Sequence, residues 1–477
     1  MHFSIPDTTD FKDEGGSSYT SFNVHINGVF HCSVRYKQLH NFHEQLKKEF
    51  TTNALPPFPP KKLLSLSGVQ LEERRMMLER YVQIISQEPR IANSHIFNGF
   101  LLQAQQETQQ EAPENVTLEV FLMNGHKISI DIQSTDQTDD VIESVASNIN
   151  LPEDFAFYFG LYLVKKEEGA DLSIVRKLQD FESPHISLKA ANKEGVHKIV
   201  LRKGYWDISM DDDLLEDRVA MNLLYVQAVS DVERNWVMVT KDQHKQLQTL
   251  KQKSSKKEYL KLVKTLKFYG YIQFKPAITD YPRSGCRAIV SAGNKELNFR
   301  IQDGDEVKEG TFKVTRMRCW RITTSTVDDN DRLEGLPRLE LAFEYLIARD
   351  ELKWITILSD QAILISMCLQ GMVDELIMKK QGKRVKRPAE RARNRRTDFI
   401  KRDSAKPSLL SSPVLNELGD NASEAVDKAK ESVKRISLPH RRIVKKDKLA
   451  AAGIKSPLKG NNIGENDAFE GIGDDDL

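Results

Sequence analysis

Basic residues and one tyrosine near the N-terminus have the types and the order that could hold a phosphate group. Arg35 and Tyr36 are adjacent, and Lys61 follows the proline-rich segment LPPFPP. A guanidinium group offers forked hydrogen-bond donors to a phosphate, which lysine cannot reproduce. Prolines stiffen a loop, so Lys61 would be held at little entropic cost. Each cation alone could be a solvated surface charge, and the segment a plain loop or SH3 ligand, but the combination favours a binding site.

The residues after Lys61 are partly apolar. Leu63, Leu64 and Leu66 belong to the segment KKLLSLSG. Apolar side chains beside a basic pocket suit insertion below lipid headgroups, and each nearby Lys or Arg adds about 1 kcal/mol of attraction to anionic lipid. We therefore expect these leucines to enter a membrane.

Short strands and a helix are predicted around these residues. Alternating segments at 19–24 and 29–36 flank an Asn-Gly pair, which is a strong hairpin signal between strand-like runs. A helix-like segment follows at 70–86, and the polar run QQETQQEAPEN after it is typical of a linker. We therefore assign residues 1–109 to a first domain.

The Arg-Tyr pair at a strand end, the proline-rich turn with its lysine, and the arginine-bearing helix together resemble a PX (phox-homology) domain. The resemblance implies that Arg35 binds the 3-phosphate of phosphatidylinositol 3-phosphate and that Tyr36 forms the floor under the inositol ring. It also implies that Lys61 meets the 1-phosphate side. Arg74, with Arg75 as its rival, would meet the ring hydroxyls.

One position departs from the pattern of that family. Many PX domains carry a second arginine where this chain has Val34. Lys37 is expected to substitute for it in part. We expect this departure to affect the selectivity among lipids more than lipid binding itself.

The rest of the chain divides into three globular stretches and a tail. Residues 115–206 begin with a hairpin and an amphipathic helix followed by more strands, an order that resembles a ubiquitin-like lobe. Residues 207–270 show helical periodicity with little strand signal. Residues 271–382 show seven strand-like runs closed by a helix from about 359 to 380, the pattern of a pleckstrin-homology or PTB-like lobe. Residues 383–477 are basic and then poor in apolar periodicity, which predicts disorder.

This order of lobes resembles a FERM-like module, and a PX domain before such a module resembles the PX–FERM subfamily of the sorting nexins. The expected fold class is multidomain α+β, with a PX domain, ubiquitin-like, helical and PTB-like lobes, and a disordered tail. The resemblance implies that NPxY or NxxY motifs in receptor tails, of lipoprotein receptor and integrin type, add a strand along the edge segment MRCWRIT. The implied cargo contacts are Trp320, Leu346, Val373 and Ile377.

An ordinary hydrophobic core is the alternative for these four residues. On the predicted final helix, a stripe that steps by four, three and four residues should face the sheet, and it consists of Ile365, Leu369, Met372 and Leu376. Val373 and Ile377 lie beside that stripe. Because a helix packing on one sheet needs only one stripe, the second pair favours a groove.

The chain ends in AFEGIGDDDL, which combines apolar and acidic residues. The resemblance implies docking onto the retriever retrieval complex, with Phe469, Ile472 and Leu477 as apolar anchors and Asp474, Asp475 and Asp476 facing a basic surface. From the residues alone, an acidic end that aids solubility is the alternative. The basic tract at 379–402 has no aromatic residue before Phe399, so we expect no nucleic-acid partner.

The chain shows no sign of catalysis. HExxH, GxSxG, Walker A and GxGxxG motifs are absent, and the four cysteines form no CxxC pair. We therefore expect no enzyme, no cofactor and no metal site. The few thiols suit a reducing cytosol. No signal peptide and no apolar run of about 20 residues is seen, so any membrane contact should be peripheral.

We therefore expect a cytoplasmic adaptor, peripheral on early or recycling endosomes, that carries receptors back to the cell surface and away from lysosomal degradation. The alternative is a FERM-type linker between membrane and cytoskeleton or a small-GTPase linker, since a ubiquitin-like lobe could bind a Ras-type GTPase. No heptad run is long enough for a coiled coil, which favours a monomer.

Overall fold

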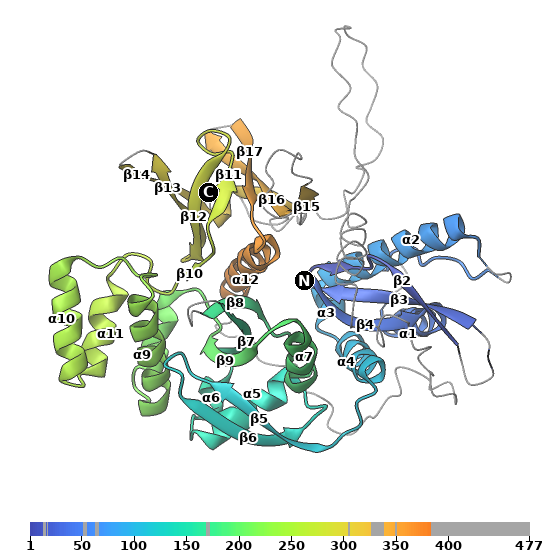
Figure 1. The fold of residues 1–477 in the computed structure, drawn as a ribbon, viewed down its shortest axis with the longest axis horizontal. Coiled ribbons are helices and arrows are strands. Elements are labelled where there is room, and N and C mark those ends of the chain that lie inside the picture. Colours follow the sequence, from blue (N-terminus) through green and yellow to red (C-terminus); the bar gives the residue numbers. More distant parts are fainter. Residues whose placement is uncertain are drawn as a thin grey trace, which may run out of the picture.

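The computed structural model describes residues 1–12, 16, 18–50, 55–62, 66–167, 172–303, 306–325, 338–348 and 351–382. Within these ranges the chain forms three sheets and their covering helices (Figure 1). None of the described helices is both long and apolar enough to cross a bilayer. Several candidate residues lie outside the described ranges: Leu63, Leu64, Phe469, Ile472, Asp474, Asp475, Asp476 and Leu477.

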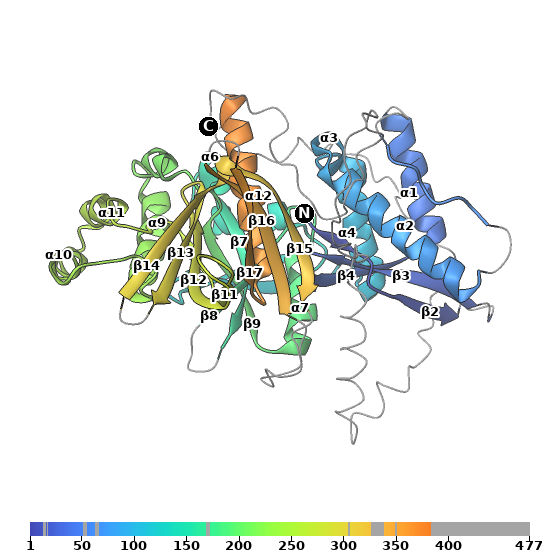
Figure 2. The ribbon, with the colours of Figure 1, turned by 90° about the horizontal axis from the view of Figure 1, so that it is seen from above.

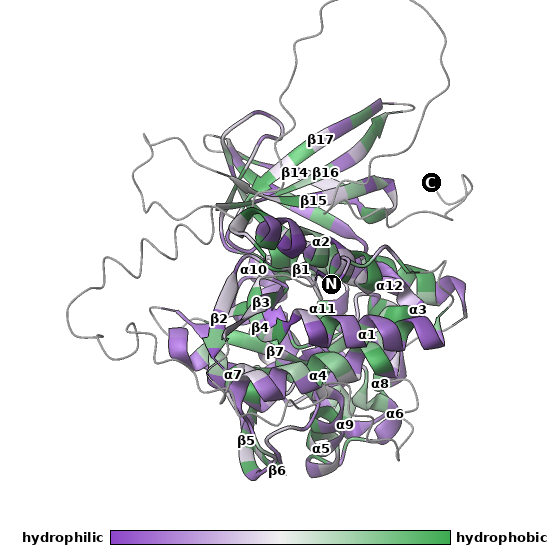
Figure 3. Ribbon diagram, turned by 90° about the vertical axis from the view of Figure 1, so that its right-hand side faces the viewer, coloured by the Kyte–Doolittle hydropathy of each residue, from purple (hydrophilic) through white to green (hydrophobic). Residues whose placement is uncertain are grey.

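The first unit is a small antiparallel sheet covered by helices. Strand β3 pairs with β1, β2 and β4. The predicted Asn-Gly hairpin is confirmed, because Ile26 pairs with Val29 and both turn residues have positive φ, as a type I′ turn requires. Figure 3 shows hydrophilic residues on the outward side of α1, whose buried side is apolar. The elements are β1 (Phe3–Ser4), β2 (Thr8–Lys12), β3 (Ser18–Ile26), β4 (Val29–Arg35), α1 (Tyr36–Glu49), α2 (Gly68–Gln87), α3 (Pro89–Ala92) and α4 (His95–Gln109).

The second unit is a five-stranded sheet with the order β6-β5-β9-β7-β8, in which β5 and β9 run parallel. Its hairpin β5–β6 shows strict alternation of buried and exposed residues along β6, as a half-buried strand requires. The elements are β5 (Asn115–Phe121), β6 (Lys127–Gln133), α5 (Thr138–Asn148), α6 (Glu153–Ala156), β7 (Phe159–Lys166), β8 (Leu172–Lys177), α7 (Pro184–Ala191), η3 (Asn192–Glu194) and β9 (His197–Lys203).

The third unit is helical, as the periodicity predicts, and it shares one hydrophobic core with the second unit. Asp211 is 2% exposed and accepts hydrogen bonds from Tyr205, Tyr269 and Lys203. It therefore stabilises the junction between the two units. The elements are η4 (Ile208–Met210), α8 (Asp211–Leu214), α9 (Arg218–Glu233), α10 (Lys241–Gln252) and α11 (Lys256–Lys264).

The fourth unit is a sheet closed by one long helix (Figure 2). The strand order is β14-β13-β12-β11-β17-β16-β15, with β10 paired to β12. The prediction of seven strands is one short, because the run 271–278 divides into β10 and β11 on either side of Pro276, which has no N–H to donate. The elements are β10 (Ile272–Gln273), β11 (Ala277–Thr279), β12 (Cys286–Gly293), β13 (Glu296–Asp303), β14 (Glu306–Lys313), η5 (Val314–Arg316), β15 (Met317–Ser325), β16 (Arg338–Ala348), β17 (Glu351–Leu358) and α12 (Ala362–Lys380).

The polar run after the first unit is not simply a linker, which corrects that prediction. Helix α4 continues through it to Gln109, and Gln105 is 4% exposed. The Gln105 side chain donates to the Ser187 hydroxyl over 3.1 Å and accepts from the Ser183 backbone N–H over 2.9 Å. The first and second units are therefore joined by a buried hydrogen-bonded contact.

Candidate functional site

The first candidate site lies where β4 ends and α1 begins. Arg35 is the N-cap residue of α1, and its backbone N–H donates to the Gln38 side chain over 2.7 Å. Its guanidinium carbon lies 3.9 Å from the centroid of the Tyr19 ring on the neighbouring strand β3. This cation–π contact orients the guanidinium group while its outer face remains half-exposed.

The proline-rich segment, α1 and α2 converge on the next residue, Tyr36. Its hydroxyl donates to the carbonyl of Pro59 over 2.7 Å. The Arg74 guanidinium carbon lies 4.2 Å from the Tyr36 ring centroid, and the same group donates to the carbonyl of Pro60 over 3.1 Å. Burial raises the pKa of the Tyr36 hydroxyl, and the nearby Arg74 opposes that shift. The neutral ring is thus held between three elements that are far apart in sequence.

A cluster of aromatic rings holds the proline-rich segment in place through Phe58. The Phe58 ring stacks on His43 with centroids 4.7 Å apart and meets Tyr81 edge-on at 4.9 Å. Phe58 also contacts Tyr36, with ring centroids 5.7 Å apart. These contacts hold the backbone that leads to Lys61, whose side chain is exposed.

The structure separates the two rival arginines of α2. Arg75 is 6% exposed and donates to the carboxylates of Glu72 and Glu79 and to the carbonyl of Ile5. It therefore holds α2 against the N-terminal strand. Arg74 lies over Tyr36 and is the arginine of the pair that faces the candidate site.

The remaining predicted lipid-site residues occupy different surroundings. Lys37 is exposed at the first turn of α1, and Leu66 is half-buried just before α2. Val34 is 1% exposed and belongs to the hydrophobic core of the first unit. Its side chain therefore faces away from the site that Arg35 and Tyr36 form.

The second candidate site is the sheet edge formed by β15 together with α12. Strand β15 stands at the end of the strand order among the described residues, as predicted. Trp320 is 2% exposed, and its indole N–H donates to the Ser366 hydroxyl on α12 over 2.9 Å. This bond ties the edge strand to the helix.

The four predicted peptide contacts differ in accessibility. Val373 is 1% exposed and lies in the same buried cluster as Trp320, Ile365 and Leu369. Leu346 is half-buried, and Ile377 is 40% exposed. The helix therefore buries a wider face than the single predicted stripe, and Ile377 is its apolar residue open to solvent at the C-terminal end.

Sequence reasoning missed several residues of both sites. Tyr19 and Phe58 position Arg35 and the proline-rich segment, but strand pairing and packing bring them there. Ser366 could have been noticed, because it is a hydroxyl inside the otherwise apolar run AILISMCL. No sequence pattern predicts that residues of the first unit lie close to Trp320.

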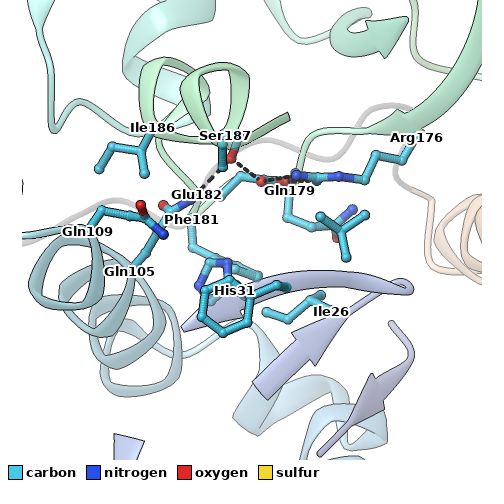
Figure 4. Close-up of a pocket in the computed structure, with 13 residues that line it drawn as sticks. Ile26, His31, Gln105, Gln109, Arg176, Gln179, Phe181, Glu182, Ile186 and Ser187 are labelled. Carbon is cyan, nitrogen blue, oxygen red and sulfur yellow. Dashed lines mark hydrogen bonds and ion pairs between the residues drawn. The ribbon is translucent and has the colours of Figure 1, made fainter. Parts of the chain in front are cut away.

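A third polar cluster lies at the contact between the first and second units (Figure 4). Arg176 forms a buried ion pair with Glu182, whose carboxylate also accepts from the Ser187 hydroxyl over 2.6 Å. His31 approaches the carbonyl of Leu101 with its Nε2 at 3.0 Å, and burial lowers its pKa to about 4. These contacts stiffen the junction and make it a structural joint.

Family models match consecutive parts of the chain. A PX domain model matches residues 22–104, a sorting nexin 17/27/31 FERM domain F1 lobe model matches 116–206, and a sorting nexin 17/31 FERM domain F2 lobe model matches 207–267. A sorting nexin 17 FERM C-terminal domain model matches 270–377. The expected fold class, a PX domain followed by FERM-like lobes, is thereby confirmed.

Relatives match the chain over most or all of its length. Sorting nexin-17 of Danio rerio is 46% identical over 485 residues, and that of Homo sapiens is 46% identical over 488 residues; in both cases all of each chain is covered. Sorting nexin-31 of Homo sapiens is 38% identical over 384 residues, which cover 80% of this chain and 86% of the relative. A PX domain implies phosphoinositide binding and a FERM module implies binding of a protein cargo, so the two candidate sites fall within a lipid-binding and an adaptor module.

Proposed function

The chain belongs to the PX–FERM sorting nexins, a family of endosomal sorting adaptors, and from this premise we propose that it joins membranes bearing phosphatidylinositol 3-phosphate to receptor tails with NPxY or NxxY motifs. The observation that carries the lipid-binding part of this proposal is the Arg74 guanidinium group over the ring of Tyr36, the residue that follows Arg35 in the chain. It supports a site that combines a flat aromatic ring with basic side chains. Such a site suits a ring that carries phosphates and hydroxyls.

The roles proposed for the lipid-site residues follow their positions. Arg35 binds the 3-phosphate, Tyr36 supports the inositol ring and Arg74 meets the ring hydroxyls. Lys61 and Lys37 are exposed cations beside the site and attract the anionic surface. The leucines that follow Lys61 enter the headgroup region: Leu63, Leu64 and Leu66.

The peptide-binding part of the proposal rests on the position of β15 at the end of the strand order among the described residues. An extended receptor tail adds to this edge as a further strand, with backbone hydrogen bonds giving affinity and side-chain contacts giving register. Trp320 and Val373 form the buried floor, while Leu346 and Ile377 remain accessible enough to touch the bound tail. The charge-free character of these four residues suits an apolar or aromatic residue of the motif.

Two contacts of moderate strength then act together. A protein already held on the endosome meets tails confined to the same membrane, so the second contact benefits from a high effective concentration. The chain is an adaptor in this scheme and performs no catalysis. It directs its cargo to the cell surface and protects it from lysosomal degradation.

The C-terminal residues complete the scheme. Phe469, Ile472 and Leu477 anchor the chain to the retriever complex, and Asp474, Asp475 and Asp476 face a basic surface of that partner. Deleting Leu477 should abolish capture of the complex from cell extracts while leaving lipid and peptide binding unchanged. Loss of lipid binding in the same variant would argue against a separate docking function.

The lipid half is tested by flotation with vesicles that contain phosphatidylinositol 3-phosphate. Arg35→Gln should weaken attachment by about 10-fold to 100-fold, since a charge-assisted contact contributes about 1.5–3 kcal/mol. Arg80→Gln is the matched control, because Arg80 is an exposed arginine of α2 in the same domain. Equal loss in both variants would mean that general charge attraction, and no specific site, holds the membrane.

The peptide half is tested by pull-down on NPxY peptides with wild-type protein and with Ile377→Asp. The variant should lose the peptide and keep vesicle binding. A linker between membrane and cytoskeleton would instead co-sediment with actin and ignore these peptides. That outcome would replace the adaptor role.

A further inference from the structure

The PX domain forms part of the surroundings of the β15 edge. A cavity of about 40 Å³ lies between the first and fourth units, and all three views place the N-terminus beside α12 (Figures 1, 2 and 3). A single water molecule needs about 10–15 Å³ of such space, so the cavity has room for a small polar group. Residues of three origins line it: Trp320 and Ile322 from β15; Ser366, Met367 and Gln370 from α12; Met1, His2, Asn27, Gln83 and Gln87 from the PX domain.

The contact between the two domains is tight at one side of this cavity. The β3–β4 turn touches α12 there, and a Cβ atom added to Gly28 would lie 2.5 Å from Cδ1 of Ile363. Gly28 also has φ of +79°, which other residues adopt with strain. The glycine thus lets the hairpin abut the helix and fixes the position of its neighbour Asn27.

The cavity lies on the path of a strand added to β15. Side chains of a strand alternate between its two faces, so Trp320 and Ile322 face the same side, and both line the cavity. In antiparallel pairing the added strand runs opposite to β15. We place the motif of the receptor tail near the start of β15, beside Ile377. The tail residues that precede the motif then lie next to Ile322.

Two residues that line this cavity each carry a buried polar atom without a hydrogen-bond partner among the described residues. Asn27 is 5% exposed, and its Oδ1 accepts from the His2 backbone N–H over 2.9 Å, which fixes the orientation of the amide. Its Nδ2 is buried and unpaired, and so is Nδ1 of His2. A buried polar atom left without a partner costs about 1–3 kcal/mol. Both atoms therefore point to a polar group supplied from outside the domain.

The chemistry of that group follows from the two atoms. Nδ2 of Asn27 can only donate, so it needs an acceptor. Burial lowers the pKa of His2 to about 4, so the ring is neutral at neutral pH and can accept at Nδ1. A hydroxyl or carboxamide group offers an acceptor and a donor together.

We propose that the peptide site is shared between two domains, with Asn27 and His2 of the PX domain binding a hydroxyl or amide side chain that precedes the tyrosine motif of the receptor tail. The inference rests on the proposed peptide-binding function of β15. Gln87, exposed at the end of α2, lines the rim and contacts the same upstream segment. Thirteen residues separate it from Arg74, about 20 Å along the helix, so the lipid site is remote.

The test measures fluorescence anisotropy of labelled peptides with the full chain. One short peptide ends at an NPxY motif, and a second extends upstream by about eight residues, roughly 26 Å of strand, with serine or asparagine at alternate positions. A third carries alanine at those positions. Asn27→Asp keeps the acceptor for His2 and replaces the donor, and Asn93→Asp makes the same change at an exposed PX position as the control.

Asn27→Asp should weaken the extended polar peptide about 5-fold to 10-fold while changing the short and the alanine peptides by less than about twofold. The control should change none. Equal effects on all three peptides, or no effect on any, would overturn the shared site. Vesicle flotation of Asn27→Asp verifies that its PX domain is folded.

A second variant does not depend on a loss of binding. Gln87→Lys should strengthen an extended peptide with upstream aspartates by about threefold and leave the short peptide unchanged. No gain would count against the shared site. If the short peptide fails to bind the wild-type protein, both the proposed function of the β15 edge and this inference are overturned. If the short peptide binds but neither variant has its expected effect, only this inference is overturned.

Discussion

The PX lipid site and the β15 edge differ in the kind of side chain that forms them. The lipid site places half-exposed arginines against two aromatic rings, Arg35 over Tyr19 and Arg74 over Tyr36, and none of these residues is fully buried. The β15 edge uses residues that are themselves core, since Trp320 and Val373 are nearly inaccessible. We therefore expect mutations at the lipid site to reduce binding without reducing stability. Mutations at the β15 edge should reduce both.

Substitution of Val373 should have the largest effect. Val373→Asp places a charge in a buried apolar cluster, which should cost at least about 4 kcal/mol and unfold the fourth unit. Thermal unfolding followed by circular dichroism measures this. Val196→Asp is the matched control at an exposed position and should leave stability nearly unchanged. A folded Val373→Asp protein that has lost only its peptide would show that this residue belongs to an open groove.

The two arginines of α2 provide the next contrast. Arg75→Ala removes the ion-pair partner of Glu79, which keeps its hydrogen bond from the backbone N–H of Ile5, and the donor to the carbonyl of Ile5, so stability should fall by about 3 kcal/mol. Arg74→Ala should change stability by less than about 1 kcal/mol and weaken attachment to vesicles with phosphatidylinositol 3-phosphate. Denaturant unfolding and flotation on both variants separate the two roles. The reverse result would exchange their assignments.

Acid should have the smallest effect, acting at the joint between the first and second units. Burial lowers the pKa of His31 to about 4 against an ordinary value of 6.5, with Glu182 opposing the shift and Arg176 adding to it. The folded state therefore favours the neutral ring. The stability that the neutral His31 ring contributes is complete well above pH 6.5 and is lost progressively as the pH falls toward 4, by about 1.4 kcal/mol at pH 5.5.

The His31→Gln variant checks this origin. Its unfolding free energy should depend less steeply on pH between 6.5 and 5 than that of the wild type. The same slope in both proteins would assign the acid sensitivity to other groups, among which His2 is also buried with a lowered pKa.

Candidate residues for the lipid site could be selected from the sequence because residue type decides their chemistry. The residue types and their order, an arginine and a tyrosine followed by a lysine after prolines, indicate a phosphate site. The Asn-Gly pair predicts the hairpin. The resemblance alone favoured Arg74 over its rival Arg75, and the physical distinction comes from the side of α2 on which Arg75 meets Glu79 and Ile5. Tyr19 was missed because strand pairing alone brings it to Arg35.

The β15 edge was less predictable because burial there depends on three-dimensional packing. Helical spacing identified the stripe of Ile365, Leu369 and Met372, but Val373 proved equally buried. The run at 105–115 was interpreted as a linker from its polarity, yet Gln105 is buried because it satisfies backbone and hydroxyl groups of the next domain. Contacts between domains leave no periodic signal in either partner.

The most direct test asks whether lipid and cargo act together on one molecule. Binding of the full chain is measured on vesicles with phosphatidylinositol 3-phosphate alone, with a membrane-tethered NPxY peptide alone, and with both. We expect vesicles with both ligands to bind at least about tenfold tighter than those with either one, because the second contact becomes intramolecular. Binding to the doubly loaded vesicles that merely equals the sum of the two single ones would contradict an adaptor that joins membrane to cargo.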